Sequence, residues 1–315
     1  MNPKLAVIAS RSGGVFSRRE AVESGYTASQ IRDRLGDGRW RTVRRGHYYE
    51  PVDLGDVPQW EKELAEHRRS IHAVMKLLHA KPVAVSHQSA LVLHKVPVWQ
   101  ADLSTVHVTR VDGKNGRAVP GLDQHASVVP ADDIVNIGGL AVASPARAVV
   151  EAACVLEFES AVVSADAALA AGLITRAQAA RLLETIRFWP GSASARAALH
   201  FADPRSESVG ESRLRVLFDR QGLPAPETQV SLTDRRGKFV ARVDFYFREY
   251  GVVVEFDGLV KYRDAAADVV VAEKRREDRL RERGLIVVRV IWDDLDTPEF
   301  TAQRARDAFD LAAAG

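Results

Sequence analysis

The chain has 315 residues, enough for about two or three domains, and its 46% hydrophobic and 27% charged residues are typical of globular proteins. No apolar run reaches the roughly 18 residues that a membrane-spanning helix needs, so we expect no membrane partner. The first residues are too weakly apolar for a signal peptide, and the single cysteine, Cys154, excludes an internal disulfide. We therefore expect a reducing, cytoplasmic setting.

The net charge of +2 is distributed unevenly along the chain. Residues 1–49 hold ten Lys or Arg against four Asp or Glu, a local charge of +6, so the remaining residues sum to −4. A basic end on a slightly acidic chain is typical of proteins that contact a polyanion. We therefore expect DNA as the partner and a place near the nucleoid, with RNA left open as an alternative.

The first 52 residues predict a winged-helix domain that begins with three short helices. An apolar helix is expected over residues 4–11. Ser17 has a glutamate three residues later, the pattern of a capping box, and begins the second helix. Thr27 begins the third helix, residues 28–35, which would enter the major groove of DNA.

Two β-like runs, residues 39–43 and 46–49, follow these helices and form the expected wing. The wing would bring arginines to phosphates, where positive charge releases counterions. The alternative is a small helical domain whose arginines are simply solvated. The residues expected to contact DNA are polar and basic positions of the third helix and the wing: Ser29, Gln30, Arg32, Arg34, Arg39, Arg41, Arg44 and Arg45.

Residues 53–204 predict an α+β connector domain. A long helix begins at Pro58 and ends near Lys81, short strands follow, and Ser144 begins a further helical stretch. We find no phosphate loop, no cysteine-pair zinc site and no Ser-His-Asp spacing in this region.

Eight of the nine histidines lie in this predicted middle domain, and seven of them lie between residues 67 and 125. Two pairs are spaced by seven residues, so the members of each pair would share a helix face. Because a metal site needs further ligands in a compact cluster, we expect core or surface histidines here. The seven residues are His67, His72, His79, His87, His94, His107 and His125.

Residues 205–315 predict a helix, three antiparallel strands, a charged helix, a fourth strand and a final helix. Ser208 is the expected start of the first helix, which carries Glu211. The second strand carries Asp244. The third strand ends in two acids, Glu255 and Asp257, whose side chains share one face. The expected strands are residues 228–232, 239–247, 252–257 and 285–291.

These four acids indicate a divalent cation. Carboxylates drawn together from three elements repel each other unless a cation lies between them. Mg²⁺ prefers oxygen ligands, and phosphodiester hydrolysis uses a divalent ion to polarise the phosphoryl oxygen and activate water. We therefore expect Mg²⁺ or Mn²⁺ bound by Asp244, Glu255 and Asp257. The alternative is a set of surface acids, although acids that close an apolar strand are seldom purely structural.

The run RVDFYF…GVVVEFDGLVKY…EKRREDRLRERGLIVVRVIWDDL resembles the DUF559 family, relatives of very-short-patch-repair endonucleases in the PD-(D/E)XK superfamily. The resemblance covers residues 207–295, and the whole layout is similar to proteins that join an AbiEi-antitoxin winged helix to such a domain. It implies a PD-(D/E)XK restriction-endonuclease-like α/β core with catalytic acids at Glu211, Asp244, Glu255 and Asp257.

The superfamily lysine is absent from its usual position, which Asp257 fills in this chain. Lys261 is the nearest replacement and Lys274 on the following helix is the second. A lysine beside the scissile phosphate orients water and offsets developing charge.

Taken together, the sequence predicts an α+β multidomain protein that acts as a metal-dependent DNA endonuclease, a hydrolase of phosphodiester bonds in DNA repair or defence. The alternative is a non-catalytic DNA-binding transcriptional regulator of antitoxin type with a degenerate nuclease fold. The endonuclease hypothesis is favoured if Lys261 reaches the acid cluster, and the regulator hypothesis is favoured if no cation reaches it. The sequence leaves the oligomeric state open.

Overall fold

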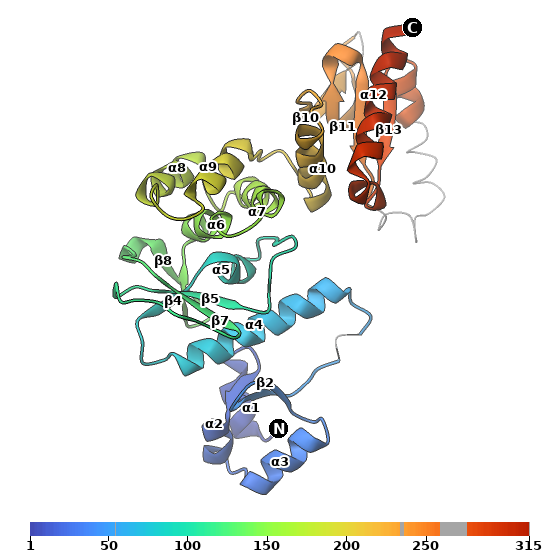
Figure 1. Ribbon diagram of the computed structural model, residues 1–315. Helices are drawn as coiled ribbons and strands as arrows, with labels where there is room; N and C mark the ends of the chain where they lie inside the picture. Colours follow the sequence, from blue (N-terminus) through green and yellow to red (C-terminus); the bar gives the residue numbers. More distant parts are fainter. Residues whose placement is uncertain (54, 234–235, 259–275, 315) are drawn as a thin grey trace. The chain divides into compact units, whose positions relative to one another are not determined.

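The computed structural model describes residues 1–53, 55–233, 236–258 and 276–314 (Figure 1). The chain is mixed α+β and multidomain, with two compact units. One unit comprises Met1–Ser164 and Leu173–Leu199, and the other comprises Ala165–Gly172 and His200–Gly315. The finer division at residues 52 and 204 stays a prediction.

The N-terminal 50 residues form three helices and a three-stranded antiparallel sheet of strand order β1-β3-β2. The capping box predicted at Ser17 and the helix start predicted at Thr27 are confirmed, since each hydroxyl accepts a hydrogen bond from the backbone N–H three residues later. Strand β1 was not predicted. The elements are α1 (Pro3–Ser10), β1 (Val15–Ser17), α2 (Arg18–Glu23), α3 (Ala28–Gly36), β2 (Arg41–Arg44) and β3 (His47–Tyr49).

Aromatic side chains make the core of this N-terminal domain. The rings of Phe16 and Trp40 meet edge to face with their centroids 4.7 Å apart, and Tyr26 packs against Trp40 at 4.9 Å. Ile31 of α3 is fully buried in the same cluster, so the opposite face of α3 points to solvent. The packing therefore fixes which face of α3 can meet a partner.

The rest of the first unit is built on a six-stranded mixed sheet of order β6-β7-β5-β4-β9-β8. Its strands are β4 (Val83–Val85), β5 (Val106–Arg110), β6 (Ala118–Val119), β7 (Leu122–Ala126), β8 (Ile134–Ile137) and β9 (Leu140–Ala143). Its helices include α4 (Gln59–Leu77), α5 (His87–Leu93), α6 (Pro145–Ala153) and α8 (Arg176–Thr185). Two further helices, α7 (Phe158–Ala170) and α9 (Ser192–Phe201), begin in the first unit and end in residues of the second.

The second unit contains a four-stranded sheet of order β10-β11-β12-β13, in which only the β12–β13 pair is parallel among the described strands. The four predicted strands are thus confirmed and form one mixed sheet, in which Asp244 and Glu255 lie on the neighbouring strands β11 and β12. The elements are α10 (Val209–Arg220), β10 (Glu227–Thr233), β11 (Phe239–Phe247), β12 (Val252–Phe256), β13 (Ile286–Val290) and α12 (Pro298–Ala314).

Strand β12 is buried on both faces. Val252 and Val254 pack in one cluster with side chains of α10 and α12, which flank the sheet (Figure 1), whereas Val253 packs with Leu232 and Leu280. A strand buried on both faces reads as a continuous apolar run, which is why this segment contains three consecutive valines. Glu255, near the end of this strand, is consequently 7% exposed.

In the described residues, no helix is both long and apolar enough to cross a membrane.

Candidate functional site

The exposed face of α3 carries the first group of predicted DNA contacts. Ser29 and Arg32 are exposed, opposite the buried Ile31. Gln30 is also exposed, but its Oε1 accepts the backbone N–H of Thr27 at 2.9 Å, so its side chain caps the helix. Half-buried Arg34 lies over the rings of Tyr26 and Trp40, at 5.1 and 5.4 Å from the ring centroids.

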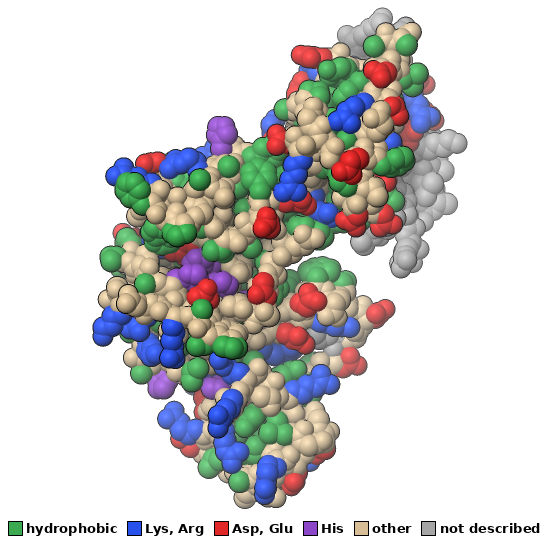
Figure 2. Space-filling model, viewed as in Figure 1, with side chains coloured by type: hydrophobic (Ala, Val, Ile, Leu, Met, Phe, Trp, Pro, Cys, Tyr) green, Lys and Arg blue, Asp and Glu red, His purple; other side chains and the backbone are tan. Residues whose placement is uncertain are grey.

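The β2–β3 hairpin and the residues before it carry the second group. Arg41 and Arg45 are exposed and Arg44 is half-buried. Arg39 is exposed but forms an ion pair with Asp37, 2.5 Å from Nη2 to Oδ2, and hydrogen bonds from Arg39 lower the pKa of that carboxyl. Figure 2 shows basic side chains gathered over this part of the chain. Arg32, Arg41 and Arg45 are therefore the predicted contacts best placed to meet a polyanion.

A second candidate site lies in the C-terminal sheet, where α10 delivers Glu211. Ser208 begins α10 and its hydroxyl accepts the Glu211 backbone N–H at 3.1 Å. The buried Glu211 carboxylate in turn accepts the Ser208 hydroxyl at 2.9 Å and the backbone N–H of Glu207 at 3.0 Å. The predicted helix start thus also orients the first acid.

Gln229 joins two of the predicted acids, and sequence reasoning missed it. It lies on β10, and its Nε2 donates to Glu211 Oε2 at 2.9 Å and to Asp244 Oδ1 at 3.0 Å. The other Asp244 oxygen accepts the backbone N–H of Phe256 at 2.9 Å. Gln229 adopts a φ of 54°, a left-handed conformation that is costly for a residue other than glycine and that collects at functional sites.

Glu255 and Asp257, the other two predicted acids, are each held by an arginine. Arg276 donates to both carboxylate oxygens of Glu255, at 2.9 and 2.5 Å. Arg289 donates to Asp257 Oδ2 at 3.0 Å, and it also donates to Glu277. Lys261 and Lys274, the predicted catalytic lysines, lie outside the described residues.

Electrostatics single out Glu211 within this group. Burial raises its pKa, and the nearby charge of Asp244 raises it further, while the hydrogen bonds from Glu207, Gln229 and Ser208 act in the opposite direction. Glu211 and Asp244 share a donor, so their oxygens lie close together, as hard ligands of Mg²⁺ or Mn²⁺ must. A cation between the Glu211 and Asp244 carboxylates would relieve the repulsion between their negative charges. Glu255 and Asp257 would have to leave their arginines to join them.

Comparisons with known proteins define the N-terminal domain. Residues 4–51 match a family model described as a transcriptional regulator, AbiEi antitoxin, so this part of the chain is an AbiEi-antitoxin-type regulator domain. Two Mycobacterium tuberculosis proteins are similar to the chain: uncharacterized protein MT2308 of strain CDC 1551 / Oshkosh and uncharacterized protein Rv2248 of strain ATCC 25618 / H37Rv. Each is 30% identical over 193 residues, which span 61% of this chain and 69% of the relative. The chain belongs to the same protein family as these two.

Proposed function

We propose that this protein is a DNA-binding regulator of AbiEi-antitoxin type that docks on the double helix through an N-terminal winged helix. The observation that carries the proposal is the basic, solvent-facing surface of the matched domain, formed by Arg32 on α3 and by Arg41 and Arg45 on the hairpin. Helix α3 would enter the major groove and the hairpin would reach the flanking phosphates.

The charge of the domain supports this arrangement. Residues 1–49 carry a net charge of +6, a sum that already includes neutralised pairs such as Arg39–Asp37. Phosphate contacts position a protein on DNA, and each releases counterions on binding. Affinity dominated by such contacts falls steeply with salt, which gives the proposal a measurable signature.

The double variant Arg41→Glu/Arg45→Glu should bind duplex DNA more weakly than the wild type. The plot of log affinity against log salt concentration should also lose about two units of slope, because each phosphate contact contributes roughly 0.9 units. Fluorescence anisotropy of a labelled duplex, measured across a salt series, gives both quantities.

A matched control is Lys81→Glu/Lys114→Glu, which changes the net charge equally at exposed lysines outside residues 4–51. This control should keep the wild-type slope. Equal slopes for the hairpin variant and the wild type would show that the hairpin makes no phosphate contact.

A second candidate function is favoured by the Gln229 bridge in the C-terminal unit. Here we propose a metal-dependent endodeoxyribonuclease built on a PD-(D/E)XK-like core, with Glu211 and Asp244 as carboxylate ligands of Mg²⁺ or Mn²⁺. When bound, the ion would polarise the phosphoryl oxygen and activate water. Gln229 would hold the two carboxylates at a fixed separation, and Arg276 would set the position of Glu255.

Incubation of the purified full chain with supercoiled, linear, mismatched and single-stranded DNA tests this second function. Nicking is expected with Mg²⁺ or Mn²⁺ and not with EDTA. If every substrate stays intact while a duplex is bound tightly, the chain acts as a regulator without nuclease activity.

A further inference from the structure

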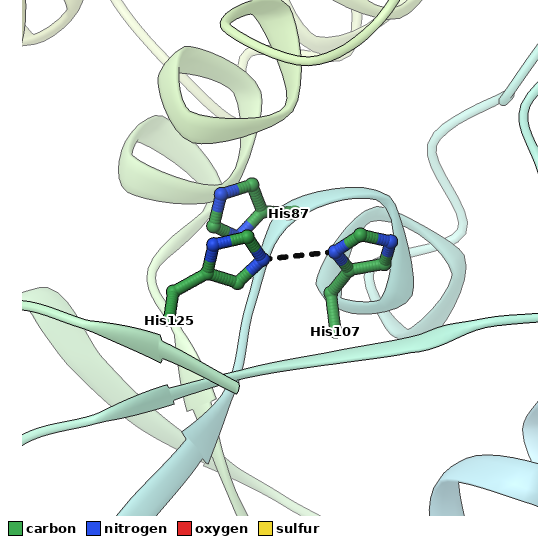
Figure 3. Close-up of side chains that lie close together, drawn as sticks. All are labelled: His87, His107 and His125. Carbon is green, nitrogen blue, oxygen red and sulfur yellow. Dashed lines mark hydrogen bonds between the residues drawn. The ribbon is translucent and has the colours of Figure 1, made fainter. Parts of the chain in front are cut away.

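Three histidines from separate elements meet inside the first unit (Figure 3). His87 is the first residue of α5, His107 lies on β5 and His125 lies on the neighbouring parallel strand β7. One ring nitrogen of each lies within 4.8 Å of those of the other two. His87 and His107 are buried, and the His125 side chain is 24% exposed, so solvent reaches one edge of the cluster.

The rings are held in close contact. Nδ1 of His107 and Nε2 of His125 are 2.9 Å apart, and the rings of His87 and His125 stack with centroids 3.8 Å apart. His87 has a φ of 52°, a left-handed conformation that is costly for histidine. The fold therefore maintains strained backbone at the residue that completes the cluster.

We infer that His87, His107 and His125 form a binding site for a divalent transition metal of the Zn²⁺ class. Neutral imidazole nitrogens are preferred ligands of such ions, and sets of three histidines with one open position are common at zinc sites. Zn–N bonds of about 2.0–2.1 Å place tetrahedral ligand atoms roughly 3.3 Å apart. Nδ1 of His107 and Nε2 of His125 already lie near this separation, whereas the stacked ring of His87 would have to turn for its nitrogen to face the same ion.

Outer hydrogen bonds on His87 and His107 leave the other nitrogen of each ring for a metal. Nδ1 of His87 lies 3.0 Å from Ser86 Oγ, which leaves its Nε2 for a metal. Nε2 of His107 lies 2.8 Å from the side-chain nitrogen of Gln88, which leaves the Nδ1 that faces His125. Oε1 of Gln88 is buried without a hydrogen-bond partner among the described residues. Turning this amide over would let Oε1 accept an Nε2–H from His107, the tautomer that a metal on Nδ1 requires.

A buried carboxylate behind His87 supplies a second, independent indication. Glu151 is 1% exposed, and its Oε1 accepts a hydrogen bond from Arg147. Its Oε2 accepts no hydrogen bond within 3.5 Å in the described part of the chain and lies 3.7 Å from His87 Nδ1. Burial raises the pKa of this carboxyl, and the backbone N–H of His87 is near enough to lower it. Histidines that bind metals typically donate their other N–H to a carboxylate. Nδ1 of His87 now lies 3.0 Å from Ser86 Oγ, so Glu151 would act as a positioning residue by accepting this N–H when a metal is bound.

The fourth ligand position faces the open edge of the cluster. Oδ2 of Asp123 lies 3.7 Å from His125 Nε2 and is half-exposed, so this carboxylate or a water molecule can complete a tetrahedral set.

Zinc titration of the full chain, without an affinity tag and stripped with a chelator, tests the site. Calorimetry should show one Zn²⁺ per chain, and Co²⁺ should give the visible absorption of a tetrahedral nitrogen site. Asp or Glu partners of metal-binding histidines are worth about 10- to 100-fold in metal affinity. We expect a loss in that range for Glu151→Gln, and a loss of more than about 100-fold for His125→Asn.

The control is His79→Gln, which changes an exposed histidine on the same unit and should bind zinc like the wild type. Circular dichroism verifies that each variant is folded. The site is refuted if the wild type binds no stoichiometric Zn²⁺ and Co²⁺ gives no tetrahedral spectrum. Wild-type affinity in a folded His125→Asn variant refutes it equally. If His125→Asn does not fold, the test rests on the other two readouts. The site is refuted if Co²⁺ gives no tetrahedral spectrum with the wild type, or if Glu151→Gln binds Zn²⁺ as tightly as the wild type.

Discussion

The substitution Asp244→Asn is expected to lower metal-dependent DNA cleavage by at least about 100-fold while DNA binding persists. Asparagine keeps the shape of the side chain but removes the negative charge that would hold the cation. It also supplies one acceptor where Asp244 now accepts from both Gln229 and the backbone N–H of Phe256. The measurement is the nicking rate of supercoiled plasmid as a function of Mn²⁺ concentration.

The matched control is Asp219→Asn, the same substitution at an exposed acid of α10. It should cleave like the wild type. Wild-type cleavage by Asp244→Asn would show that the nuclease does not need the Asp244 carboxylate and would remove Asp244 from the proposed site.

Removal of the Asp166 carboxylate should destabilise the C-terminal unit by about 3–5 kcal/mol. Asp166 is 1% exposed, and its two oxygens accept from Arg215 at 3.0 and 2.7 Å, with further bonds from Ser212 and from the backbone N–H of Asp203. Asp166→Ala leaves the guanidinium of Arg215, a residue that is 8% exposed, without its counterion. An uncompensated buried charge is far more costly than a lost surface pair.

Urea unfolding followed by circular dichroism should therefore show that this unit unfolds at a lower urea concentration in Asp166→Ala than in the wild type. Glu227→Ala, which breaks the exposed ion pair with Arg248, should leave the transition nearly unchanged. An unchanged transition in Asp166→Ala would mean that the buried pair contributes nothing to stability.

Local signals in the sequence predicted much of this fold. Helices α2 and α3 begin where Ser17 and Thr27 cap them, because a cap is decided by residues three positions apart. The alternation in Phe239–Phe247 predicted β11, and the valine run predicted β12. Since the two strands pair side by side, the expected proximity of Asp244 and Glu255 followed from the same signals.

Features that depend on contacts between distant residues were not predictable in this way. Strand β1 has only three residues, too few to show a period, and it exists because it pairs with β3. Gln229 gave no signal, because its role depends on two acids delivered by other elements.

The histidine cluster illustrates the same limit. The spacing of seven residues directed attention to His87 and His94, but Nε2 of His94 hydrogen-bonds the carbonyl of Ala143 at 2.8 Å. The true neighbours of His87 are His107 and His125, which the parallel pairing of β5 and β7 brings together. Helical periodicity carries no information about strand pairing.

Amide hydrogen exchange of the full chain, with and without a mixed-sequence DNA duplex at low salt, tests the central claim most directly. Low salt maximises phosphate contacts, so the duplex need not contain a specific target. The account predicts that DNA slows exchange in α3 and in the β2–β3 hairpin. Unchanged exchange in both elements, with slowing confined to other parts of the chain, would contradict it.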